Sequence, residues 1–455
     1  MNTNLRSRRQ QISDLGRGAF SLDPHELGAT VQTVAQWIVL GSAAGALAGI
    51  ASAIFLVTLQ WATLIRLADP RLLFLLPVAG FLVGWTYFHF GKAVARGSNL
   101  IIDELHEHRR PILLRMAPMI LIGTVLTHLF GGSAGREGTA IQMGASLADW
   151  LRRRLGLKPE QRRLLLMAGI SGGFGSVFGT PVAGFVFGLE VQSVGRIRYE
   201  GIVPCFTAAL VGDWVTRFLI QGLGLTHSHY PQLVPLDSDP GLLLKVVLAG
   251  IVFGVTSLLF VEVTHAIKHI TGNVVQWSPL RPIIGGLLII ALTLLVGSQD
   301  YLGLSLPLIQ KSVSGGDVVP FAFLLKLVFT AVTLGTGFMG GEVTPLFVIG
   351  ATLGSTVGRL IGVDPALMAS IGFVAVFAGA SNTPLACMVM GVELFGGGAI
   401  LHLGVGCFVA YLASGHRSIY PAQRVNVPKA HGVDILADES LEALKERRLI
   451  KVPPE

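Results

Sequence analysis

Charged residues are scarce in this sequence. Of its 455 residues, 34 are Lys or Arg and 27 are Asp or Glu, so 13% are charged, whereas a soluble globular protein carries about 25%. Between residues 340 and 415 the charged residues are Glu342, Arg359, Asp364 and Glu393. An exposed surface of that length would carry many more. Together with 51% hydrophobic residues, this scarcity excludes disorder, a fibrous protein and almost any soluble enzyme of this length. It predicts a chain that lies mostly in lipid.

Cysteine is also rare. The three cysteines, Cys205, Cys387 and Cys407, lie in apolar stretches without C-x-x-C spacing. We therefore expect neither a disulfide framework nor a metal site, and no motif indicates a cofactor.

Positive charge is concentrated between the apolar runs. One basic loop contains Arg152, Arg153, Arg154, Lys158, Arg162 and Arg163, a second contains Arg196 and Arg198, and residues 226–241 contain no Lys or Arg. The positive-inside rule places the first two loops and both termini in the cytoplasm and the third loop outside. The net charge of +7 would suggest nucleic acid in a soluble protein, but this topology accounts for it, and we expect no nucleic-acid partner.

The apolar runs divide the chain into three parts. Residues 1–30 are polar without a signal-peptide core and are predicted to form a cytoplasmic leader. Residues 31–425 hold ten or more apolar helices, at about 20 residues per crossing, and residues 426–455 form a short cytoplasmic tail. Glycine and proline break several runs, and the freed backbone groups must face protein or a watery cavity. We therefore expect an all-α, polytopic membrane protein with broken half-spanning helices, as in channels and transporters.

Two segments recur in the same order. Thr180-Pro181-Val182-Ala183 recurs as Thr383-Pro384-Leu385-Ala386 (383 − 180 = 203), and Gly144-Ala145-Ser146-Leu147 recurs as Gly350-Ala351-Thr352-Leu353 (350 − 144 = 206). They predict two inverted structural repeats at about residues 70–225 and 280–420. Glu190 and Glu393 follow the first motif at equivalent positions, which favours structural roles at helix ends over separate proton sites.

Arg136 and Glu137 lie in a glycine-rich break between two apolar helices, residues 131–139. A carboxylate there is costly unless it has a function. The glycines should leave N–H groups unpaired at the start of the next helix, and such a helix start attracts anions. An anion and the Glu137 carboxylate would compete for these donors, and protonation would release Glu137. The alternative is an Arg136–Glu137 ion pair that only fixes the loop in place. His128, just before the glycine break, fits a buried structural histidine better than a proton carrier.

Two further breaks offer polar donors. Residues 340–345 provide the Thr344 hydroxyl and a second carboxylate, Glu342, although an N-cap Thr344 with Glu342 in the first turn is an equal alternative. Ser98 and Asn99 precede another helix. We expect the three helix starts to converge on one anion. Tyr420 follows the last apolar run, and taken alone it would indicate a tyrosine at the membrane interface.

Taken together, these segments resemble the CLC family of chloride channels and chloride/proton antiporters, over about residues 35–425. Residues 135–138 match its G-R-E-G-P motif, residues 97–99 stand at G-S-G-I-P, residues 341–345 stand at G-x-F-x-P, and Tyr420 falls on its central tyrosine. The resemblance implies that Glu137 is the gating and proton-accepting residue. It also implies anion contacts from Ser98, Asn99, Arg136, Gly138, Val343, Thr344 and Tyr420.

The departures from the family pattern resemble its bacterial fluoride/proton antiporter branch. Thr139 replaces a proline, residues 99–101 replace Gly-Ile-Pro, and residues 342–344 replace an apolar-Phe-apolar set. In that branch the positions of Glu342, Val343 and Thr344 handle fluoride, and Val191 stands where chloride antiporters carry an internal glutamate. Fluoride is strongly hydrated and needs replacement donors, which Thr344 and Asn99 could supply. Because Ser98 is a chloride-type serine, a chloride/proton antiporter or a voltage-gated-type chloride channel remains the alternative.

The resemblance therefore implies a homodimeric fluoride/proton antiporter, not an enzyme, that exports fluoride across the lipid bilayer of the bacterial cytoplasmic (inner) membrane. An intramembrane serine protease is an alternative from another class, with Ser171 as nucleophile and His402 as base. The number of spans, the repeated halves and Glu137 argue against it. A carrier of another small solute is a third possibility, but it explains none of the motifs.

Overall fold

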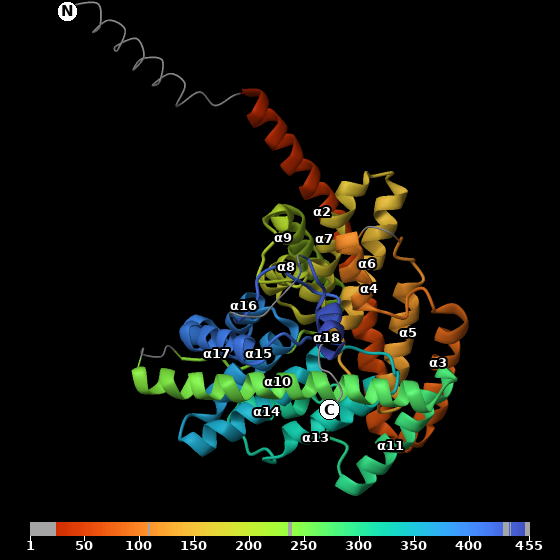
Figure 1. The fold of residues 1–455 in the computed structure, drawn as a ribbon, viewed down its shortest axis with the longest axis vertical. Coiled ribbons are helices and arrows are strands. Elements are labelled where there is room, and N and C mark those ends of the chain that lie inside the picture. The colour runs from red at the N-terminus through yellow and green to blue at the C-terminus, as the bar shows by residue number, and fades with distance from the viewer. Residues whose placement is uncertain (1–23, 108–109, 235–238, 431–435, 437, 451–455) are drawn as a thin grey trace, which may run out of the picture.

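The structure, a computed structural model, describes residues 24–107, 110–234, 239–430, 436 and 438–450, and most of them are helical (Figure 1). The first half of the chain contains α2 (Pro24–Ala68), η1 (Pro70–Leu75), α3 (Leu76–Phe90), α4 (Ser98–Glu107), α5 (Met116–Leu129), α6 (Glu137–Arg154), α7 (Pro159–Phe178), α8 (Pro181–Glu190), β1 (Ser193–Val194), η2 (Tyr199–Gly201) and α9 (Ile202–Gln221). The second half contains α10 (Pro240–Val274), η3 (Ser278–Leu280), α11 (Arg281–Val296), α12 (Leu306–Val313), α13 (Ala322–Gly335), α14 (Val343–Ile361), α15 (Pro365–Ser381), α16 (Pro384–Phe395), η4 (Gly397–Ala399), α17 (Ile400–Ala413), β2 (Arg424–Val425) and α18 (Leu441–Ile450).

The helices have the lengths and surfaces of a membrane domain. Among the described residues, six helical stretches are long and apolar enough to cross a membrane, and they include α2, α10 and α14. Large apolar side chains such as Trp61, Trp214, Phe218 and Leu295 lie exposed on the outside, an arrangement that lipid favours and water does not. The expected all-α, polytopic fold is confirmed.

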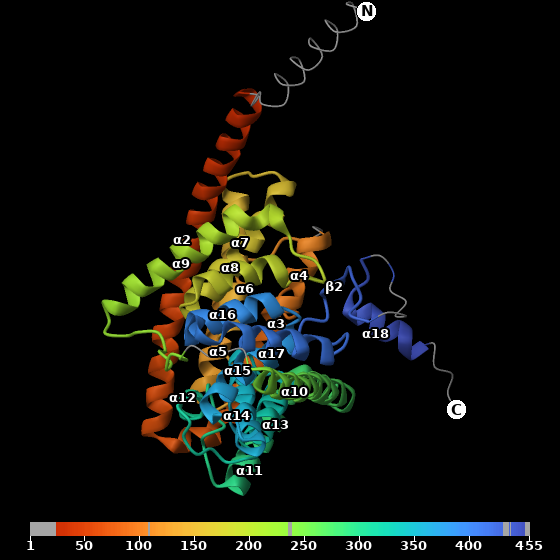
Figure 2. The ribbon, with the colours of Figure 1, turned by 90° about the vertical axis from the view of Figure 1, so that its left-hand side faces the viewer.

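The first helix begins earlier than the hydrophobic pattern indicates. α2 starts at Pro24, so it includes the last seven residues of the expected leader, and residues 1–23 lie outside the described residues. Both ribbon views show the first turns of α2 extending beyond the other helices (Figures 1 and 2). The described residues of these turns are exposed.

The two halves are built from equivalent helices. α5 begins at Met116 and α13 at Ala322, and α6 begins at Glu137 and α14 at Val343, so each pair is 206 residues apart (322 − 116 and 343 − 137). The halves meet at two equivalent glycines, because the Gly135 N–H donates to the Gly341 carbonyl at 2.6 Å and the Gly341 N–H donates to the Gly135 carbonyl at 2.9 Å. This mutual bridge lies directly before the start of α6 and of α14.

The recurring Gly-Ala motif has a packing reason. A Cβ at Gly144 in α6 would collide with the Gly169 carbonyl in α7, and a Cβ at Gly350 in α14 would collide with the Gly372 carbonyl in α15. Small residues are what allow two helix backbones to approach this closely in lipid. The repeat in the sequence is therefore a repeat of helix contacts.

α7 and α8 form a hairpin. Gly179 ends α7 in the left-handed conformation, with φ = 75°, and Pro181 begins α8 after a short turn. The open ends of the two helices also lie close together, since Arg163 near the start of α7 donates to the Gln192 side chain just beyond α8 at 2.9 Å.

The segment after α17 returns to the membrane domain. β2 pairs in parallel with β1, with Ser193 opposite Arg424. Glu262 of α10 accepts from Lys445 of α18 at 3.1 Å and also pairs with Arg417. The tail is therefore attached to the domain at these points, and α18 lies at its edge (Figure 2).

Candidate functional site

Glu137 is the first residue of α6, and its carboxylate is completely buried. It accepts the Thr344 backbone N–H at 3.0 Å and lies 2.7 and 2.6 Å from the Thr344 hydroxyl through its two oxygens. The sequence suggested that Glu137 competes for donors of its own helix. In the structure the donors belong to the other repeat, because Thr344 is in the first turn of α14, where the helix dipole favours a negative charge.

Arg136 adds a second group of contacts to the same carboxylate. Its backbone N–H lies 3.3 Å from Glu137 Oε2 and its Nε lies 3.4 Å from Oε1. Its guanidinium also lies over the Phe178 ring, 5.6 Å from the centroid. The Arg136–Glu137 pair therefore exists, but its contacts are longer than those of Thr344, which is the tighter partner.

Tyr420 brings an unused donor toward the site. Its side chain is buried, and its hydroxyl has no hydrogen-bond partner among the residues that the structure describes. The charges of both Glu342 and Glu137 act on this hydroxyl. Because buried polar groups are normally satisfied, the free hydroxyl is a donor that a ligand could use, and a contact of Tyr420 with an anion stays a prediction.

Ser98 and Asn99 open α4, as the third glycine break predicts, and both are partly exposed. The Asn99 side-chain oxygen accepts the Ala422 N–H at 3.2 Å, so this amide holds the Tyr420 segment in place through its oxygen. A contact of Asn99 or Ser98 with an anion stays a prediction.

The start of α14 differs from the arrangement in which Thr344 is the N-cap residue. α14 begins at Val343, so Glu342 occupies the N-cap position and Thr344 is the second helical residue. An N-cap Thr344 with Glu342 in the first turn is therefore wrong. In the described part of the chain the Glu342 side chain makes no capping hydrogen bond, and the charge of Lys268 acts on it. Val343 is buried, and Gly138 lies against Gly341.

The other polar candidates have structural surroundings. The two ring nitrogens of His128 lie 2.8 Å from the Thr124 carbonyl and 3.0 Å from the Ala134 carbonyl, so the ring connects α5 to the loop before Arg136. Ser171 and His402 are both buried, yet neither side chain has a hydrogen-bond partner within the described ranges. They do not form the Ser–His pair that a serine protease requires.

One supporting residue has no signal in the sequence. The Gln423 side chain donates to the carbonyls of Val191 at 2.7 Å and Ser381 at 2.8 Å, and accepts from Ser418 at 2.7 Å and Asn382 at 3.1 Å. It therefore ties the segment that carries Tyr420 to both repeats. No local pattern distinguishes this glutamine from others, because its partners are brought together only by the fold.

The sequence profile described as voltage gated chloride channel matches residues 79–415 of the chain. The chain belongs to the CLC family. This CLC protein is 50% identical over 406 residues, 88% of each chain, to a chloride/fluoride channel protein of Pseudomonas syringae pv. tomato.

Solved CLC structures share the fold. A CLC-type fluoride/proton antiporter superposes with a TM-score of 0.82 at 33% identity, covering 89% of this chain and all of that one. A slow cyanobacterial Cl−/H+ antiporter superposes with a TM-score of 0.71 at 21% identity, covering 95% and 99%. The chain is thus a membrane protein with the CLC fold, and the second likeness bears on its fold alone.

Proposed function

We propose that this CLC protein is a fluoride/proton antiporter of the bacterial cytoplasmic membrane, where it exports fluoride. In this proposal it is a homodimer, and it is a transporter rather than an enzyme. Two similar proteins support the choice of ion, since one is named a chloride/fluoride channel protein and the other a fluoride/proton antiporter. Chloride is the alternative ion, because the 50% identical protein is named for chloride as well as fluoride.

The observation that carries this proposal is the set of hydrogen bonds that Thr344 donates to the Glu137 carboxylate. A backbone N–H and a hydroxyl from one residue bind a carboxylate that lies at the start of α14. An incoming anion needs the same donors, so the anion and the ionised carboxylate exclude each other. Protonation removes the negative charge of Glu137 and weakens these charge-assisted hydrogen bonds. The site can therefore hold either the anion or the ionised carboxylate, which is the exchange that antiport requires.

The donors also favour fluoride over chloride. A carboxylate oxygen is a small, strongly hydrated acceptor, and fluoride resembles it more than the larger chloride does. Each anion loses its hydration water on entering the site. The free energy of hydration that is lost is greater for fluoride, so a fluoride site needs strong hydrogen-bond donors to compensate for it. The Thr344 hydroxyl and the free Tyr420 hydroxyl provide such donors.

The test is ion efflux from liposomes that contain the purified protein, with fluoride, chloride and pH recorded together. We expect fluoride to leave much faster than chloride, protons to move in the opposite direction, and both coupled fluxes to stop in Glu137→Gln. Glu442→Gln, a change at an exposed carboxylate of α18, is the matched control and should behave as the wild type. Comparable chloride flux would identify a chloride transporter, and fluoride flux without proton movement would identify a channel.

A further inference from the structure

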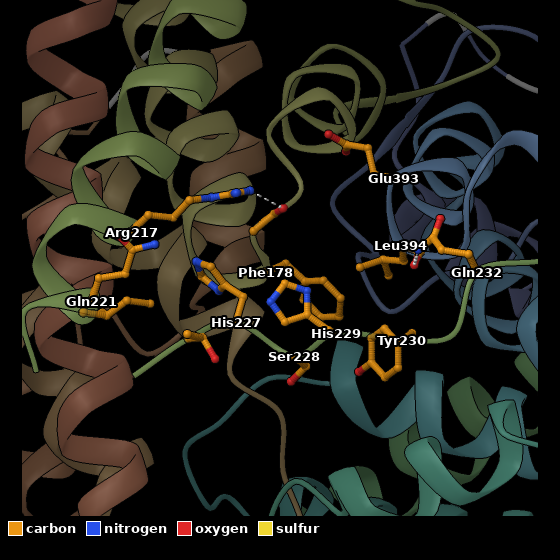
Figure 3. Close-up of a pocket in the computed structure, with 13 residues that line it drawn as sticks. Phe178, Arg217, Gln221, His227, Ser228, His229, Tyr230, Gln232, Glu393 and Leu394 are labelled. Carbon is orange, nitrogen blue, oxygen red and sulfur yellow. Dashed lines mark hydrogen bonds between the residues drawn. The ribbon is translucent and has the colours of Figure 1, made fainter. Parts of the chain in front are cut away.

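A cavity of about 290 Å³ lies beside the loop that joins α9 to α10, the loop expected to face the outside. Figure 3 shows two histidines of this loop at its centre, between Arg217 and Tyr230. Its walls include Phe178, Arg217, His227, His229, Tyr230 and Glu393. The function proposed above does not yet use any of the titratable groups in this cavity.

The His227 ring packs closely against the turn at Gly179. A Cβ on Gly179 would lie 2.8 Å from its Cγ, and Gly179 has φ = 75°, so both space and backbone conformation require glycine beside the ring. The Gly179 carbonyl accepts from Arg217 at 3.1 Å, which anchors the turn. The Nε2 atom of His227 is buried and has no hydrogen-bond partner within the described residues, and Asp213 Oδ1 is 4.0 Å away.

Charged groups face His227 from several elements. Asp213 and Arg217 of α9 form an ion pair at 2.8 Å, Arg136 acts from the start of α6, His229 from the same loop, and Glu393 of α16 lines the cavity. Burial, followed by the charges of Arg136, Arg217 and His229, lowers the pKa of His227 to about 4. The ring is thus neutral at pH 7, and its protonated form is a strong proton donor.

Two side chains in contact, Phe178 and Arg136, connect this cavity to the Glu137 carboxylate. The Phe178 ring, which lines the cavity, lies under the Arg136 guanidinium. Arg136 in turn contacts Glu137, and the charge of Glu137 acts on Tyr230 in the cavity wall. Arg136 is therefore the group that connects the wall of this cavity to the Glu137 carboxylate.

We propose that His227 transfers protons between water in this cavity and Glu137. The inference deepens the proposed antiport. A hydronium ion in the cavity gives a proton to the imidazole ring and becomes water. After Glu137 has left Thr344 and moved toward the cavity, the N–H bond breaks as an O–H bond forms on its carboxylate, and the ring returns to its neutral form. The loaded form becomes about tenfold more populated for each unit that external pH falls toward the pKa of the ring.

The experiment compares His227→Gln with the wild type in fluoride-loaded liposomes while external pH is varied from 7.5 to 5.5. Protein-free liposomes at each pH correct for hydrogen fluoride that crosses the lipid unaided. We expect His227→Gln to slow coupled proton uptake at least about tenfold, to flatten its pH dependence and to leave the ratio of protons to fluoride unchanged. His269→Gln, at an exposed histidine of α10, is the control.

Chemical rescue distinguishes proton transfer from a structural role. We expect external imidazole to restore much of the rate of His227→Ala but to have no effect on His269→Ala. Wild-type rates in His227→Gln, or a loss that imidazole does not restore, would overturn the role of His227 while leaving the antiport intact. A wild-type protein without coupled proton movement would instead overturn both the antiport and this inference.

Discussion

Glu190 and Glu393 each cap the helix of the opposite repeat. The Glu190 carboxylate, at the end of α8, accepts the N–H groups of Leu385 at 3.2 Å and Ala386 at 2.8 Å at the start of α16. The Glu393 carboxylate, near the end of α16, accepts those of Val182 at 2.9 Å and Ala183 at 2.7 Å at the start of α8. Each negative charge thus lies at the positive end of a helix dipole, so the two short helices stabilise each other.

This exchange of caps predicts an additive loss of stability. Replacing either glutamate by leucine removes two charge-assisted hydrogen bonds and should lower stability by about 1–2 kcal/mol. The two caps lie at opposite ends of the pair, about 15 Å apart for a helix of ten residues. The double variant should therefore lose the sum of the two single losses. Inactivation half-lives at raised temperature in detergent would measure this, and a double variant no worse than either single variant would contradict it.

Composition and periodicity were enough to predict the class of the fold. The lack of charge predicts lipid burial, and the recurring Thr-Pro and Gly-Ala motifs predict two related halves, whose helices do start at equivalent positions. Helix boundaries were less predictable. Polarity alone places residues 24–30 outside the first apolar run, but the chain there continues the same helix without a break.

The site was predictable in its parts but not in its connections. The sequence pointed to Glu137 and Thr344 as separate helix-start residues, yet their direct contact joins positions 207 residues apart. Such contacts depend on how the two repeats meet at Gly135 and Gly341, which no local pattern encodes. For the same reason nothing in the sequence indicated that the Asn99 oxygen binds the Ala422 N–H, and an anion contact of Asn99 stays a prediction.

Removing the Thr344 hydroxyl should weaken fluoride transport more than chloride transport. A hydrogen bond to a charged group contributes about 1.5–3 kcal/mol, so Thr344→Ala should reduce the apparent affinity for fluoride about 10- to 100-fold. Thr344→Ser keeps the hydroxyl and should stay close to the wild type. Efflux assays over a range of fluoride and chloride concentrations would measure both ions. An equal loss for the two ions would show that the hydroxyl only positions Glu137.

A side chain at Gly135 should slow transport without unfolding the protein. A Cβ there would lie 2.8 Å from Pro345 Cδ and 3.0 Å from the Gly341 carbonyl oxygen, so Gly135→Ala should push the two repeats apart where Thr344 meets Glu137. Overpacking of this kind costs about 1–3 kcal/mol. We expect an intact, folded protein with at least about a tenfold lower flux. Gly28→Ala, with no atom within 4 Å of its new Cβ, is the control. Normal flux in Gly135→Ala would show that transport does not depend on the close contact of the two repeats at Gly135.

Lys429 should make attachment of the tail dependent on pH. Its Nζ donates to the Tyr411 carbonyl at 2.7 Å and the Ser414 hydroxyl at 3.1 Å, and burial lowers its pKa to about 7. The unfolded tail has a lysine of pKa about 10.4 and so binds more protons than the folded tail between pH 7 and pH 10. Stability must therefore rise as pH increases through this range and be lowest below pH 7. Hydrogen exchange of residues 424–430 should show more protection at pH 9 than at pH 6.5, after correction for the intrinsic exchange rate. Lys429→Met should remove this difference, and a difference that persists in Lys429→Met would assign it to another group.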